Sequence, residues 1–150
     1  MTLKDICDAI AALYAPGTIS TPSGATAIRN SYGQAPHSMP NTPAVVVMPQ
    51  SGEAVIGSGT WDVTHQIDVQ FFLSKAPGDV ERVETQRQLW IPVLLSATLG
   101  QLQLGLGSDN LKSALPTGYE FTTLDYGGDI YDGIVIRLEV IVRDPVTLTP

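Results

Sequence analysis

The alternation of apolar and polar positions is clearest in the middle of the chain. From Trp61 to Leu73 the odd positions are apolar apart from His65, and polar residues separate them as far as Gln70. Side chains two residues apart lie on the same face of a β-strand. The segment therefore predicts a long strand with one buried and one solvated face, and it places His65 on the buried face.

A helical spacing is found at the start of the chain. Apolar residues recur there at i, i+3, i+4 and i+7, at Leu3, Ile6, Cys7, Ile10, Leu13 and Tyr14. This spacing predicts an amphipathic helix within residues 1–15, which Pro16 and Gly17 end. Cys7 lies on the apolar stripe, so we expect it to be a small core residue.

A second helix is predicted after Asp79, which is a suitable N-cap residue. Its stripe comprises Val80, Val83, Arg87, Trp90 and Leu94, widened by Leu89 and Val93. The polar positions Glu81, Arg82, Glu84, Arg87 and Gln88 are assigned to its solvated side, although Arg87 also falls on the stripe. Pro92 predicts either a kink or a second helical piece that begins with this proline.

The segment between the first helix and Ala44 contains five of the eleven prolines. It predicts a long flexible loop over residues 16–43, with a short extended piece within Ala27–Tyr32. A loop of this length in a compact domain is usually functional, or is ordered by a partner.

Further strands are predicted on both sides of the second helix. Ala44–Met48 reads as a buried strand, Pro49–Gly52 as a turn and Ala54–Gly57 as a short returning strand. Residues 100–108 remain unassigned, and Asn110–Leu115 is predicted as a helical turn. A hairpin follows, in which Gly127-Gly128 joins a strand ending at Tyr126 to one that Asp144-Pro145 stops.

These elements predict a single α+β domain, a mostly antiparallel sheet with helices packed on one face. Its parts are the helix (1–15), the Pro-rich N-terminal loop (16–43), a sheet-and-helix core (44–144) and a polar tail (145–150). A length of 150 residues is typical of one domain.

Composition and charge exclude several classes of function. Apolar residues make up 43% of the chain and charged residues 15%, which favours a packed core. The net charge of −7 argues against a protein that binds duplex DNA or an anionic membrane. One cysteine cannot form an internal disulfide, no signal peptide is apparent, and no apolar run is long enough to span a membrane. We expect a soluble domain made in a reducing compartment.

No motif for catalysis or metal binding emerges. Ser58, between Gly57 and Gly59, lacks the spacing of a nucleophile elbow, and His37 and His65 lack the spacing of a zinc site. We therefore expect no enzyme, no metal and no cofactor. Aromatic residues near the last hairpin have acidic neighbours, which favours protein contacts over nucleic acid.

The whole pattern resembles the tail terminator (tail completion) proteins of long-tailed bacteriophages. The features are an N-terminal helix, a Pro-rich loop ending Asn41-Thr42-Pro43-Ala44-Val45-Val46-Val47, the strand Trp61–Leu73, Asp79 with its helix, and a final hairpin with Tyr126-Gly127-Gly128, Tyr131-Asp132-Gly133-Ile134 and Arg137-Leu138-Glu139-Val140. They cover nearly the full chain and are pattern matches, not catalytic signatures.

The resemblance implies a homo-hexameric ring that ends the tail tube, stops tube polymerisation and presents a surface for joining the DNA-filled head. The implied partners are the major tail tube protein and a head-closure or neck protein, and DNA passes through the lumen without specific binding. The implied location is the virion (tail or neck), with assembly in the host cytoplasm. We further expect an acidic lumen that prevents contacts with phosphate.

A ring needs complementary patches on opposite sides of each subunit. The candidates are the loop Ser20–Asn41, the edge around Trp61 and the hairpin tip Tyr126–Tyr131. The expected interface residues are Tyr32, His37, Trp61, Tyr126, Asp129 and Tyr131.

Two alternatives stay open. The chain could be another neck component, such as a head-closure, adaptor or minor tail protein. It could instead be a small-ligand-binding bacterial α+β domain, which would need a concave apolar pocket with convergent polar groups.

Overall fold

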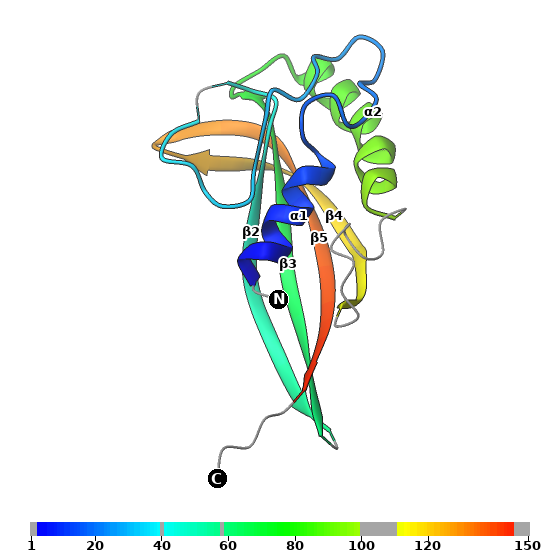
Figure 1. Cartoon of the computed structure of the whole chain (residues 1–150). Coiled ribbons are helices and arrows are strands. Elements are labelled where there is room, and N and C mark those ends of the chain that lie inside the picture. Colours follow the sequence, from blue (N-terminus) through cyan, green and yellow to red (C-terminus); the bar gives the residue numbers. More distant parts are fainter. Residues whose placement is uncertain (1–2, 40, 58, 100–110, 146–150) are drawn as a thin grey trace.

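The sheet has five strands in the order β1-β2-β3-β5-β4, and all neighbours are antiparallel except the pair β1 and β2. The computed structural model describes residues 3–39, 41–57, 59–99 and 111–145 (Figure 1). The elements are α1 (Leu3–Leu13), β1 (Asn30–Tyr32), β2 (Ala44–Ile56), β3 (Thr60–Lys75), α2 (Val80–Leu99), β4 (Leu111–Tyr126) and β5 (Asp129–Pro145). The predicted α+β domain with a mostly antiparallel sheet is confirmed.

Both helices cover the same face of the sheet, which we call the helix-side face. The main core lies there and joins residues of α1 and α2 to inward residues of β2, β3, β4 and β5. On β3 this face carries Ile67, Val69 and Phe71, the odd positions of the predicted alternation. The strict period of two in the sequence thus identified the buried face correctly.

α1 buries Ile6, Cys7 and Ile10 as predicted, whereas Leu3 is partly exposed at its first position. Tyr14, directly after the helix, is fully buried, and its hydroxyl is hydrogen-bonded to Thr98 Oγ1 near the end of α2. This contact joins the C-terminal ends of the two helices.

α2 begins as the sequence predicts. Asp79 Oδ1 accepts hydrogen bonds from the backbone N–H groups of Glu81 (3.0 Å) and Arg82 (3.3 Å), which makes Asp79 the N-cap. One helix runs from Val80 to Leu99 with Pro92 inside it, so no second piece begins at the proline. The predicted stripe was wrong at its margins, because Val80 and Leu89 are exposed.

β2 is longer than predicted. The turn expected at Pro49–Gly52 is wrong, because β2 continues through it and pairs with β3 as far as Ile56 opposite Trp61. A β-bulge between Pro49 and Ser51 shifts the pairing register with β3, and the two strands stay paired on both sides of it. Proline is tolerated there because this part of β2 is an edge that needs no outward N–H donor. The reversal comes later, where Gly57 N donates to Thr60 O at 2.7 Å.

The C-terminal hairpin is confirmed, with Gly127 and Gly128 at φ 60° and 88° between β4 and β5. Positive φ at both positions fits the tight turn that matches the twist of two strands. The helical turn expected at Asn110–Leu115 is wrong from Leu111 onward, because β4 begins there and buries Leu111 and Ala114. Residues 100–108, Asn110 and the tail beyond Pro145 lie outside the described residues.

A smaller core lies on the opposite face, which we call the open face. It consists of Val46, Phe72, Leu124, Tyr131 and Val135, with Tyr32, Met39, Met48 and Tyr126 packed around it. These residues gather at one end of the sheet, near the β4–β5 turn. The sheet is therefore covered on both faces at this end.

The other end of the sheet projects beyond the helices as a narrow extension (Figure 1). We call this extension the arm, and define it as Pro49–Ile56 of β2 with Thr60–His65 of β3. A strand of 16 residues is about 50 Å long at about 3.3 Å per residue. α1, with 11 residues, covers only about 16 Å at 1.5 Å per residue. The strands are thus longer than the helix that packs on them, and β2 is exposed from Pro49 onward.

Candidate assembly surfaces

The arm carries Trp61, the sequence-predicted interface residue farthest from the turn between β4 and β5. Trp61 pairs with Ile56, and Val63 with Ala54, so all four side chains lie on the helix-side face of the arm. Trp61 remains 38% exposed and Ile56 73% exposed. A hollow of about 530 Å³ follows this face, lined by Leu3, Pro49, Gln50, Ser51, Gly52, Glu53, Ala54, Trp61, Val63 and His65. The apolar face of the sheet therefore continues uncovered along the arm.

The tip of the arm is apolar on its other face too. Val55, opposite Asp62, is 68% exposed and points to the open face. Val55 and Ile56 are the two most exposed large apolar residues in β2. Neither residue was predicted as an interface residue from the sequence, because a turn was predicted before them. An exposed strand end is recognisable only once the length of the covering helix is known.

The open face of the arm is polar beside Val55. Asp62 accepts hydrogen bonds from Arg143 Nε (2.8 Å) and Nη2 (3.2 Å), and Lys112 Nζ lies 3.4 Å from Asp62 Oδ2. The hydrogen bond from Arg143 is the main cause that holds the pKa of Asp62 below its ordinary value. These solvent-exposed pairs connect β3, β4 and β5, and each contributes little to stability.

Cross-strand polar pairs continue along the open face toward the smaller core. Gln66 donates to Glu139 at 3.4 Å, and Arg137 Nη2 lies 3.0 Å from Glu120 Oε2. Partial burial raises the pKa of Asp68, although nearby Arg137 opposes the shift. Acidic and basic side chains alternate here, so the open face has charges of both signs.

Three predicted interface residues are brought together at the opposite end of the sheet. The Tyr126 and Tyr131 rings contact Phe72 edge-on, with centroid distances of 5.8 and 5.5 Å. Tyr32 packs against the same cluster. Desolvation, together with nearby Tyr32, raises the pKa of Tyr126. Tyr131 is buried, so its ring serves the smaller core, whereas Tyr32 and Tyr126 are half-buried at its rim.

The remaining two predicted residues are exposed. Asp129 is in the β4–β5 hairpin and its carboxylate lies 3.4 Å from Lys75 Nζ. His37 is exposed in the loop between β1 and β2. The structure thus gathers Tyr32, Tyr126, Tyr131 and Asp129 near one end of the sheet and leaves Trp61 on the arm.

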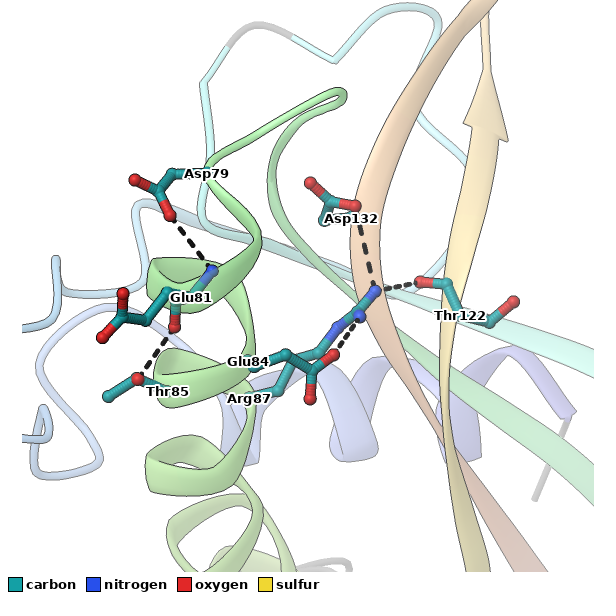
Figure 2. A network of polar contacts seen from close by, with 7 residues as sticks. All are labelled: Asp79, Glu81, Glu84, Thr85, Arg87, Thr122 and Asp132. Atoms are coloured by element: carbon teal, nitrogen blue, oxygen red, sulfur yellow. Dashed lines mark hydrogen bonds and ion pairs between the residues drawn. The ribbon is translucent and has the colours of Figure 1, made fainter.

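A buried ion pair between α2 and the hairpin was not foreseen (Figure 2). Arg87, assigned by sequence partly to the solvated side, is only 9% exposed. Its Nη2 donates to Thr122 O at 2.7 Å and lies 3.9 Å from Asp132 Oδ1, while Nη1 lies 3.3 Å from Glu84 Oε1. Its guanidinium also lies 5.8 Å from the centre of the Phe121 ring. These contacts make Arg87 an anchor between α2 and the sheet.

The cysteine, histidine and serine that were considered as candidates for chemistry lie in different parts of the fold. Cys7 is buried in the main core, as predicted, and burial raises the pKa of its thiol, which disfavours the reactive thiolate. His65 is half-buried on the helix-side face, and Ser58 lies outside the described residues. Among the residues that the structure describes, no group of three or more His, Cys, Asp or Glu side chains could hold a metal ion. None of the described helices is long and apolar enough to cross a membrane.

Two separate shallow hollows lie between α2 and the loop that follows α1. One, about 350 Å³, is lined by Ser23, Gly24, Asp79, Glu81, Arg82, Thr85, Gln86 and Leu89. The other, about 380 Å³, is lined by Ile19, Ser20, Pro92, Val93, Ser96 and Ala97. Most residues that line the first hollow are polar, and neither hollow encloses a ligand-sized apolar cavity.

Comparison with known proteins adds no family assignment. No protein-family model matches the chain, and no curated protein shows significant sequence similarity to it. The exposed surfaces of the arm and of the β4–β5 end of the sheet are therefore the structural features that bear on function.

Proposed function

We propose that the chain is a structural subunit that assembles with copies of itself through the arm. Following the resemblance to tail terminator proteins, the assembly is a six-fold ring on the end of a phage tail tube. The ring stops tube polymerisation and forms the interface that joins tube and head, and DNA passes through it without specific binding. The observation that carries the proposal is the arm, with Val55, Ile56 and Trp61 exposed beyond the helices.

The exposed side chains of the arm favour an assembly role on energetic grounds. Burying an isoleucine or valine side chain contributes about 1.5–3 kcal/mol. Tryptophan is enriched among the residues that dominate binding energy at protein interfaces. Ile56 and Trp61 lie side by side on one face of the arm, and adjoining exposed apolar side chains on a projecting element are typical of an interaction site.

The net charge of −7 suits assembly on a template. Like-charged subunits repel one another in solution, which keeps them apart at low concentration. The end of a tail tube would hold several copies together and raise their effective concentration. Each copy would then offer the arm to one neighbour and an acceptor surface to the other, as a closed ring requires.

The decisive experiment is electron microscopy of lysates in which this gene is silenced while the other particle genes are expressed. The proposal expects overlong or frayed tail tubes beside separate, DNA-filled heads. Restoring the gene should return normal tails. Tails of normal length with unjoined or leaking heads would instead assign the chain to the head side of the neck. Intact infectious particles would refute a role in the neck.

A further inference from the structure

His65 lies at the point where the covered part of β3 becomes the arm. On the helix-side face, Ile67 is fully buried in the main core, whereas Trp61 is 38% exposed. His65 lies between them on this face and is half-buried. Its imidazole lies beside Gly52, the opposite residue on β2, because a Cβ atom at Gly52 would be 3.4 Å from His65 Nδ1. The absence of a side chain at Gly52 gives the ring its space on the arm.

The same hollow contains His65 and the exposed tryptophan of the arm. Trp61 and His65 both line it and lie about 13 Å apart along β3. A stable interface buries about 800 Å² on each partner, which is a patch about 28 Å across. A contact centred on Ile56 and Trp61 therefore extends about 14 Å to each side and reaches His65. Since β2 ends at Ile56, such a contact has to extend toward His65 and not away from it.

A covered position at His65 favours the neutral imidazole. The charged form loses its hydration when a second surface covers it, and this loss costs free energy. An ordinary histidine titrates near pH 6.5, so the ring is neutral at pH 7.5 and mostly protonated at pH 5.5 while the arm is in water. Association through the helix-side face of the arm must therefore remove a proton at the lower pH.

The charged groups near this face on the described residues are solvent-exposed. The first turn of α1 carries Lys4 and Asp5, which have opposite charges, and Glu53 lies at the rim of the hollow. On β5 the residue opposite His65 is Val140, which is buried and uncharged. Water screens exposed charges, so their effect on an imidazolium is small compared with its loss of hydration.

We propose that His65 is a pH-dependent switch for the association of copies through the arm. The copies associate tightly while its imidazole is neutral and weakly when it is protonated. This inference rests on the proposed self-assembly and adds its regulation.

The direction of the pH effect distinguishes this switch from general repulsion between copies. Acidification reduces the net charge of −7, which weakens repulsion and by itself strengthens association. Protonation of His65 has the opposite effect. For an imidazole that titrates near pH 6.5 in water and stays neutral in the interface, the Kd should rise about tenfold between pH 7.5 and pH 5.5.

Sedimentation equilibrium of the full chain at pH 5.5, 6.5 and 7.5 tests the switch. About 1 M salt shortens the Debye length to about 3 Å and removes most of the repulsion. The wild type should show the tenfold rise in Kd, whereas His65→Gln, which cannot be protonated, should have the same Kd at all three pH values. His37→Gln is the matched control, because His37 is the other histidine of the chain and is exposed in a loop. It should keep the pH dependence of the wild type.

Dilution calorimetry of the wild type provides a second measurement that needs no variant. At pH 6.5, in two buffers with different enthalpies of ionisation, dissociation should take up about half a proton per copy. This uptake decides the question if His65→Gln does not associate at any pH.

The remaining outcomes separate the two proposals. A wild-type Kd that stays constant or falls on acidification would overturn the switch and leave self-assembly standing. The same holds for a pH dependence that persists in His65→Gln, or for dissociation without proton uptake. Absence of association of the wild type at every pH would overturn both the switch and the self-assembly of the proposed function.

Discussion

Arg87 Nη2 donates a 2.7 Å hydrogen bond to the carbonyl oxygen of Thr122, a contact between residues 35 apart in sequence. The same guanidinium faces the carboxylate of Asp132, and both side chains are mostly buried. A helix that packs on a sheet normally does so through apolar residues, as Val83 and Trp90 do here. Arg87 adds a polar contact that fixes where α2 sits along β4 and β5.

Replacing Arg87 by methionine should therefore destabilise the fold strongly. Arg87→Met keeps much of the apolar stem but leaves the buried Asp132 carboxylate without its cation, and such a loss costs about 3–5 kcal/mol. Urea unfolding followed by circular dichroism measures the change. Arg137→Met is the control, because its partner Glu120 is half-exposed and a surface pair contributes at most about 1 kcal/mol. Similar losses in the two variants would show that Arg87 is not an anchor.

The case of Arg87 shows where sequence patterns stop being informative. Strand β3, the Asp79 cap and the Gly127-Gly128 turn were predicted because each signal is local: a period of two, an acceptor beside free N–H groups, and glycines at positive φ. The burial of Arg87 depends on Thr122 and Asp132, which no local pattern connects to it. The position of Arg87 on the apolar stripe of α2 correctly indicated that it is buried, but its charge favoured an assignment to the solvated side.

The candidate site was predictable only in part. Trp61 was selected from sequence, and the structure places it on the arm. Val55 and Ile56 were missed, because Pro49 and Gly52 are typical turn residues and their place in an edge strand depends on a bulge. That the arm is uncovered depends on the relative lengths of α1 and β2, which is a tertiary property.

Gly133 should not tolerate a side chain. A Cβ atom there would lie 2.6 Å from the carbonyl oxygen of Phe71 and 2.6 Å from Leu124 Cδ1. The backbone oxygen cannot move aside, so Gly133→Ala should lower the free energy of unfolding by about 1–3 kcal/mol. Gly118→Ala is the matched control on the same hairpin, since nothing lies within 4 Å of its Cβ position. It should be neutral or stabilising by up to about 1 kcal/mol. Thermal unfolding distinguishes the two, and a neutral Gly133→Ala would contradict the close packing.

Tyr14 should make the fold sensitive to alkali. Burial raises the pKa of its hydroxyl to about 12, from 10.0 for a free tyrosine. Between these values the hydroxyl ionises in the unfolded chain but not in the folded one, so the free energy of unfolding falls as the pH rises above 10. Over two pH units the loss approaches roughly 3 kcal/mol.

Tyr14→Phe tests this prediction, because the free energy of unfolding of the variant can be compared with that of the wild type at each pH. At pH 7 the variant loses the hydrogen bond to Thr98 and should be less stable by about 1 kcal/mol. Above pH 10 the penalty should shrink and then reverse, because phenylalanine has no proton to lose. Urea unfolding at intervals from pH 7 to pH 11.5 measures the difference, and a constant difference would contradict the raised pKa.

Ile56→Lys should abolish most self-association and leave the subunit folded. Ile56 is 73% exposed, so the substitution should change stability by no more than about 0.5 kcal/mol. It also reduces the net negative charge of the chain from −7 to −6, so weaker association could not come from added repulsion between copies. Losing the burial of one isoleucine should raise the Kd by about 10- to 100-fold. Leu115→Lys makes an equivalent change at a 41% exposed leucine on β4, outside the arm and outside the predicted hairpin-tip patch, and should associate like the wild type. Sedimentation equilibrium in high salt measures both, and equal affinities would show that the arm does not hold the copies together.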